Sequence, residues 1–153
     1  MADQNTSVLK ALNDLIATCH DAEEGYAKAA KGVHNHALSD QLTGISGERS
    51  QFAEELGKIV SGLGGQPATD AHYGGILHSG WVDLETRIRP KDEHDILEDC
   101  RRGDEGTLRH YQHALDQELP QEARAVVERQ RNAVQNDLNA LQNRASHGKG
   151  QHA

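Results

Sequence analysis

Aromatic residues, prolines and β-branched runs are scarce in this chain of 153 residues. It contains one Trp, three Tyr, one Phe and three Pro. Strands favour aromatic and β-branched residues, and proline breaks helices, so this scarcity argues against a β fold and favours helices packed through small aliphatic side chains. The length suits one domain with a sizeable core.

Basic charge and long apolar runs are also lacking. The chain has 16 Lys and Arg against 24 Asp and Glu, a net charge of −8. A nucleic acid or an anionic membrane would meet an unfavourable field, so we expect neither as a partner. No apolar run approaches the roughly 20 residues of a membrane span, and residues 1–6 lack the basic and apolar regions of a secretory signal. We therefore expect a cytoplasmic protein.

A faint internal repeat organises what is present. A Cys-x-x-x-acid-acid-Gly pattern begins at Cys19 and recurs 81 residues later at Cys100, and the same offset carries Arg49 onto Gln130. Each half thus places an acid on its first helix and a cationic or amide donor 26 residues later on its second. Two such helical hairpins are the plan of a ferritin-like bundle.

Apolar residues at spacings of three and four predict four long helices. Helix-capping and helix-breaking residues mark their ends. The helices are expected over 7–31, capped by Thr6 or Ser7 and stopped by Gly32; 38–63, ended by Gly64; 92–117, capped by Asp92; and 120–145, opened by Pro120.

A shorter helix is predicted in the long connection, over 74–88, with Leu77, Trp81 and Leu84 on one face. Two short-looped hairpins joined by a long crossover give the one-crossover topology of ferritin-like proteins. We therefore expect an all-α, ferritin-like four-helix bundle over 7–145, with disordered ends at 1–6 and 146–153.

Each long helix is expected to send one polar side chain into the core. At about 100° per residue, the four side chains fall within the apolar stripes of their helices. Two carboxylates supply acceptors, while a guanidinium and an amide supply forked donors, so they can satisfy one another in a buried hydrogen-bonded network. The four are Glu23, Arg49, Asp104 and Gln130.

A carboxylate-bridged dimetal centre is the alternative for the same layer. It needs a Glu from each of two helices and a Glu-x-x-His from each of the other two. The chain offers Glu48-x-x-Gln51 and Glu128-x-x-Arg131 instead, and Arg49 would repel a cation. We therefore expect no cofactor. The alternative is an iron or manganese site with Glu23, Glu48 and Asp104 as ligands.

The two cysteines are expected one turn before their acids on antiparallel helices. This places them on opposite sides of the polar layer, too far apart for a disulfide. We expect Cys19 and Cys100 to be small buried thiols.

Ten histidines are present, and two pairs, His34 with His36 and His110 with His113, fall outside the apolar stripes. Solvated surface residues are the better interpretation of these pairs. Trp81 is expected to anchor the crossover, with its indole N–H bonded to a partner. Alternatively, Trp81 and His78 line a pocket for a small ligand between the crossover and the bundle.

Several stretches are specific in combination: Cys19-x-Asp21-x-Glu23-Glu24-Gly25-Tyr26, Glu48-Arg49-Ser50-Gln51-Phe52, Gly80-Trp81-x-Asp83-Leu84 and Gly103-Asp104-Glu105. Through them, roughly residues 8–145 resemble an uncharacterised bacterial family of ferritin-like four-helix-bundle proteins. That family usually has Glu where this chain has Asp104, and the shorter side chain weakens a ligand role. The resemblance implies the fold and a bacterial soluble protein, implies a stress-associated role by analogy, and implies no established reaction.

These observations predict a non-catalytic structural or interaction protein whose exposed faces form a homodimer or a larger homo-oligomer. One alternative is an iron or manganese oxidoreductase or storage protein. Another is a small-ligand carrier that uses the groove under the crossover.

Overall fold

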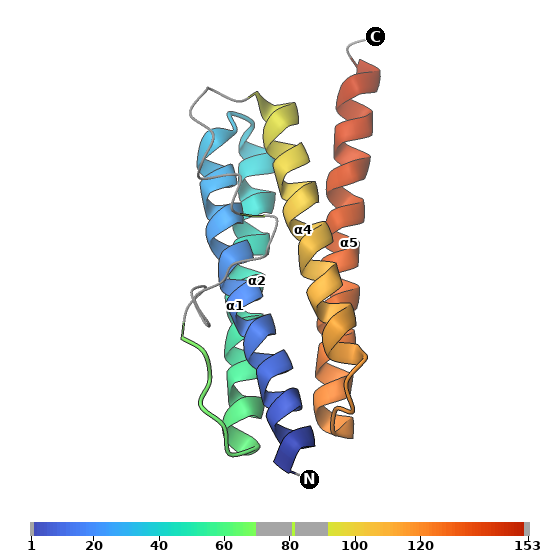
Figure 1. Ribbon diagram of the computed structural model, residues 1–153. Helices are drawn as coiled ribbons and strands as arrows, with labels where there is room; N and C mark the ends of the chain where they lie inside the picture. Colours follow the sequence, from blue (N-terminus) through green and yellow to red (C-terminus); the bar gives the residue numbers. More distant parts are fainter. Residues whose placement is uncertain (1, 70–80, 82–91, 152–153) are drawn as a thin grey trace.

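The computed structural model describes residues 2–69, 81 and 92–151, with side chains at 5–69, 81 and 92–144. It contains four helices: α1 (Ala2–Gly32), α2 (His36–Gly62), α4 (Glu93–Leu115) and α5 (Gln121–Gln151). α1 and α2 form one antiparallel hairpin, and α4 and α5 form the other (Figure 1). α2 and α4 run in the same direction, so the all-α, one-crossover bundle predicted from the sequence is confirmed.

Several helix ends follow the predicted signals. The Asp92 side chain accepts a hydrogen bond from the Asp95 backbone N–H at 2.8 Å, which caps α4 as expected. The Asn35 side chain caps α2 in the same way through Leu38 at 2.9 Å, a cap that the sequence analysis missed. Gly64, just beyond α2, has a φ of 87°, a conformation that glycine adopts without strain.

Two helices are longer than predicted. α1 begins at Ala2, so Thr6 and Ser7 lie inside the helix and do not cap it. α5 continues to Gln151, through most of the segment expected to be a disordered tail. Extending a nucleated helix adds a hydrogen bond for each residue fixed, and no proline interrupts either end. The predicted helix over 74–88 lies outside the described residues, apart from Trp81.

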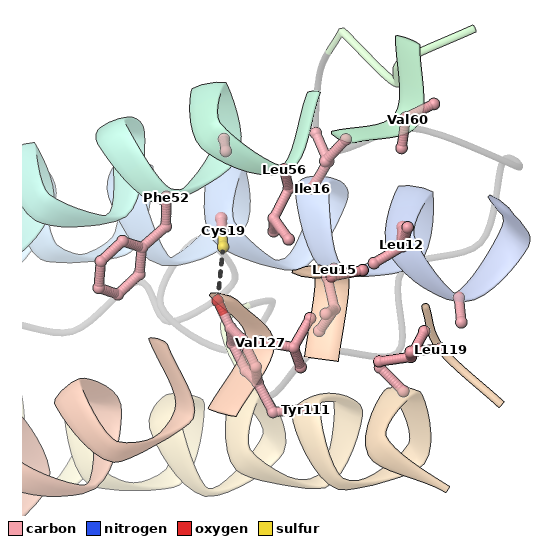
Figure 2. Close-up of a cluster of buried hydrophobic side chains, with 14 of the residues drawn as sticks. Leu12, Leu15, Ile16, Cys19, Phe52, Leu56, Val60, Tyr111, Leu119 and Val127 are labelled. Atoms are coloured by element: carbon pink, nitrogen blue, oxygen red, sulfur yellow. Dashed lines mark hydrogen bonds between the residues drawn. The ribbon is translucent and has the colours of Figure 1, made fainter. Parts of the chain in front are cut away.

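The core consists of two apolar clusters that follow one another along the bundle. The first cluster takes the N-terminal half of α1 and the C-terminal half of α2, and Figure 2 shows its side chains meeting between the helices. The second cluster takes the other halves of these helices and the beginning of α4. Each fully buried Leu or Val contributes about 1.5–3 kcal/mol. Representative members are Leu12, Leu15, Leu56 and Val127 of the first cluster, and Leu38, Leu42 and Ile96 of the second.

None of the described helices combines the length with the apolar character needed to cross a bilayer.

Candidate functional site at the centre of the bundle

A buried ion pair joins the two hairpins between the apolar clusters. Arg49 of α2 donates from Nη1 to Asp104 Oδ1 at 2.6 Å and from Nη2 to Asp104 Oδ2 at 2.9 Å. Both side chains are 0% exposed. This is the bidentate geometry that makes guanidinium–carboxylate pairs strong and directional. The structure therefore brings together two of the four residues expected in the polar layer.

Two further side chains complete the surroundings of this pair. The Tyr26 hydroxyl of α1 donates to Asp104 Oδ2, and the Tyr26 ring centroid lies 5.3 Å from Arg49 Cζ. Asp137 of α5 accepts from Arg49 Nη2 at 3.1 Å. All four helices thus contribute to one layer, in which a single guanidinium faces two carboxylates and an aromatic ring.

The electrostatics of the layer fix the protonation of its members. Burial raises the pKa of Tyr26 well above its ordinary value, and the neighbouring Asp104 carboxylate raises it further. Burial opposes the charge of Arg49, but Asp104 more than offsets this effect, so the pKa of Arg49 is raised. Tyr26 remains a hydrogen-bond donor, and Arg49 remains a cation.

Glu48 lies at the edge of the layer, with a side chain that is 33% exposed. Its Oε1 atom is 3.6 Å from Arg49 Nε, and neither buried atom has a hydrogen-bond partner among the described residues. Burial and the adjacent Asp137 carboxyl raise the pKa of Glu48 to about 7. Glu48 therefore titrates near neutrality.

The predicted inward orientation of Glu23 is wrong. Its side chain is 36% exposed and its Oε1 atom contacts His20 Nδ1 at 3.2 Å, on the outside of α1. The fully buried position beside it belongs to Ala22. Charge explains the difference, because Arg49 already faces the carboxyl groups of Asp104, Asp137 and Glu48, and a further buried acid would lack a counter-charge.

Gln130 is fully buried as predicted, but it belongs to a second chain of hydrogen bonds. Its Oε1 accepts from the Tyr111 hydroxyl at 2.7 Å, and its Nε2 donates to Glu55 Oε1 at 2.8 Å. Figure 2 shows the Tyr111 hydroxyl directed at Cys19 Sγ, 3.3 Å away. The expected network of four residues is therefore divided: Arg49 and Asp104 form one group, Gln130 belongs to another, and Glu23 belongs to neither.

Both cysteines are buried and form no disulfide, and each lies in a different apolar cluster. Cys19 belongs to the first cluster and Cys100 to the second, so they lie on opposite sides of the polar layer as the repeat predicts. Burial raises the pKa of Cys19 to about 11, which keeps it a thiol at neutral pH.

The residues of the layer do not fit a dimetal centre. Among the described residues, no three His, Cys, Asp or Glu side chains converge in a way that would hold a metal ion. Asp104 uses both oxygens on Arg49 and Tyr26, and Glu23 of the alternative ligand set lies outside the layer. A cation in this layer would also meet the buried guanidinium charge.

The paired histidines lie away from this layer. His34, His36 and His113 are exposed, and His110 Nδ1 bonds the Gly106 carbonyl of its own helix at 2.9 Å. His78 lies outside the described residues, whereas Trp81 is only 4% exposed and bonds the Thr107 hydroxyl at 3.4 Å. The predicted partner for the indole N–H is therefore present.

Sequence reasoning did not assign Tyr26, Asp137, Tyr111 or Glu55 to these groups. The rings of the two tyrosines are buried in the apolar clusters, and only their hydroxyl groups have a polar role. Asp137 sits beside Val134 and Leu138 in the sequence, at the margin of the stripe of α5. The distance between Asp137 and Arg49 depends on how α5 is aligned along α2. The spacing of apolar residues in the sequence does not predict that alignment.

Comparisons with known proteins identify the fold. The family described as Domain of unknown function (DUF2383) matches residues 7–117. The bacterioferritin of Desulfovibrio desulfuricans, described with a diiron site, is 19% identical with a TM-score of 0.74, covering 97% of this chain and 83% of its own. The dodecameric thioferritin of Bacteroides fragilis is 14% identical with a TM-score of 0.73, covering 96% and 90%. No curated protein matches this chain.

Proposed function

We propose a structural role for this chain, which belongs to the family described as Domain of unknown function (DUF2383) and has a bundle similar to that of bacterioferritin. In this proposal the chain is a non-catalytic bundle whose centre is held by an ion pair in place of a dimetal site. It acts through its outer faces, as a subunit of a homo-oligomer.

The observation that carries the proposal is the position of the Arg49 guanidinium. It is bound at 2.6 and 2.9 Å to Asp104, the acid that would have to serve a metal, and both groups are 0% exposed. A divalent cation would have to take Asp104 from Arg49 and leave an unpaired positive charge in the same dry layer. Such a charge costs several kcal/mol.

Assembly is supported by the fold and its relatives. The thioferritin with the same bundle is dodecameric. The described part of this chain is likewise a bundle of long helices packed side by side (Figure 1). We therefore propose a homo-oligomer in a bacterial cytoplasm, with a stress-associated role by analogy with ferritin-like proteins.

Metal analysis of protein purified without an affinity tag tests the non-catalytic assignment. After incubation with Fe(II) or Mn(II) and desalting, we expect no stoichiometric metal and no Fe(II) oxidation above the buffer rate. The Arg49→Met variant is measured beside the wild-type protein, because removing the guanidinium leaves the Asp104 carboxylate available to a metal ion. Stoichiometric iron or manganese in the wild-type protein, lost in Asp104→Asn, would establish the alternative site and defeat the proposal.

Analytical ultracentrifugation tests the assembly separately. The protomer mass is 16.7 kDa, and we expect a species at a multiple of that mass. A monomer at micromolar protein concentration would contradict the proposed oligomer. It would not change what the metal analysis says about the non-catalytic assignment.

A further inference from the structure

Trp81 occupies a slot between the two hairpins, and two glycines form its walls. A Cβ built on Gly25 of α1 would lie 2.2 Å from Trp81 Cε3. A Cβ built on Gly103 of α4 would lie 2.4 Å from Trp81 Cδ2 and Cε2. Both distances are far below van der Waals contact, so any side chain at either position would collide with the ring. The space between Gly25 and Gly103 therefore holds the Trp81 ring and leaves no room for a side chain at either glycine.

The remaining contacts recognise the face and the edge of the indole separately. The Tyr26 ring lies 4.9 Å from the indole, centroid to centroid, with an interplanar angle of 57°. Trp81 Nε1 donates to Thr107 Oγ1 at 3.4 Å, while the Thr107 hydroxyl donates its own hydrogen to the Gly103 carbonyl at 3.2 Å. Because that hydrogen is already used, Thr107 presents only lone pairs to the slot. The edge therefore selects a donor.

We propose that the Gly25–Gly103 slot is a recognition site for an indole, that is, a flat aromatic bicycle with one N–H donor. Trp81 is its resident ligand, and free indole competes with Trp81 for the same place. This proposal does not depend on the structural role above: Tyr26 contacts both the indole and Asp104, but Gly25, Gly103 and Thr107, which the experiments below test, make no hydrogen bond to Arg49 or Asp104 among those described. It also relocates the ligand pocket expected near Trp81 to a position between α1 and α4, within the described residues.

The geometry distinguishes recognition from simple filling of space. A plain apolar cavity would accept any hydrocarbon of the right shape. A site whose edge carries a hydrogen-bond acceptor that cannot also donate binds a ligand without an N–H less tightly, because that acceptor is then left without a partner. The chain also offers a clean test, because Trp81 is its single tryptophan.

The experiment uses Trp81→Ala, titrated calorimetrically with indole and with indene, which has the same outline but no N–H. We expect one indole per chain, binding about three- to tenfold more tightly than indene because one hydrogen bond is at stake. Wild-type protein should bind indole at least about tenfold more weakly, since the tethered Trp81 acts at a high effective concentration.

Two second-site changes in the Trp81→Ala background locate the binding. Gly25→Ala should abolish it by placing a methyl group in the ring position, and Thr107→Val should remove the preference for indole over indene. A folded Trp81→Ala protein that does not bind indole would overturn the proposal. Equal binding of indole and indene would do the same.

A second measurement covers the case in which Trp81→Ala does not fold. Biosynthetic replacement of tryptophan by β-(3-benzothienyl)alanine changes only Trp81, and substitutes sulfur for the N–H with little change in shape. We expect the replacement to lower the Tm in the otherwise wild-type protein and to have a smaller effect on the Tm in the Thr107→Val background, where the hydrogen-bond acceptor for the N–H is already absent. An unchanged Tm would show that Thr107 does not recognise the N–H.

Discussion

Replacing Arg49 with Met leaves Asp104 buried without its counter-charge. Asp104 is 0% exposed and loses hydrogen bonds of 2.6 and 2.9 Å, retaining only the Tyr26 hydroxyl. Asp137 also loses a partner, but its side chain is 20% exposed and water can replace the bond. The cost is therefore that of one stranded buried carboxylate, about 3–5 kcal/mol.

Urea unfolding followed by circular dichroism measures this loss. With a slope of about 2 kcal/mol/M, the midpoint of Arg49→Met should fall by about 1.5–2.5 M. The matched control is Arg129→Met, because Arg129 is 55% exposed and pairs with Glu55 at the surface. That exposed pair should be worth less than about 1 kcal/mol.

The double variant Arg49→Met, Asp104→Leu measures the interaction energy between the two side chains separately from the effect of each single substitution. Replacing both members of a buried pair by apolar groups is often neutral, so much of the loss should be recovered, with a coupling energy of about 2 kcal/mol or more. The reasoning fails if Arg49→Met costs no more than the Arg129 control. It also fails if the double variant is as unstable as the sum of the single ones.

Three other outcomes are expected. Gly25→Ala should destabilise the fold by about 1–3 kcal/mol through overpacking, whereas Gly44→Ala, which meets nothing within 4 Å inside α2, should stabilise it by about 0.5–1 kcal/mol in thermal unfolding. The pKa of Glu48 is about 7 in the fold against an ordinary 4.5, so its ionised form destabilises the protein above pH 7, and that penalty fades as the pH falls towards 4.5. Glu48→Gln should therefore exceed wild-type stability at pH 8 by about 1 kcal/mol, allowing for solvent screening, and match it near pH 5; an advantage that grows on acidification would reverse this sign. Because Cys19 and Cys100 are buried and the pKa of Cys19 is about 11, neither thiol should react with Ellman's reagent at pH 8 until denaturant is added, and rapid labelling of the native protein would contradict their burial.

The fold could be predicted because its signals are periodic. Apolar spacing, the Asp92 cap and the placement of short and long connections give the helices and their topology. The same helical wheel placed Arg49, Asp104 and Gln130 inside, and all three are 0% exposed. A wheel gives the direction of a side chain from its helix, and it carries no account of charge. It therefore turned Glu23 inward, where Arg49 is the one buried basic residue among those that the structure describes.

The partners within the site depend on how the helices align, and the sequence does not record that alignment. The repeat singled out Gly25 and Gly106 as equivalent. On the antiparallel pair α1 and α4, however, it is Gly103 that lies with Gly25 against the Trp81 ring, while the Tyr26 hydroxyl reaches Asp104. Tyr111 reaches Gln130 for the same reason. These contacts are products of packing and become readable only once the hairpins are joined.

The contact between Arg49 and Asp104 also limits how far the helices can slide along one another. Leucine meets leucine almost as well after a shift of one heptad, so the two apolar clusters alone discriminate poorly between alignments. The same shift would carry Asp104 about 10 Å past Arg49 and leave two opposite charges stranded in hydrocarbon. We expect this one bidentate contact to allow a single axial register between the two hairpins. It would thereby also determine the outer surface to which any neighbouring copy must be complementary.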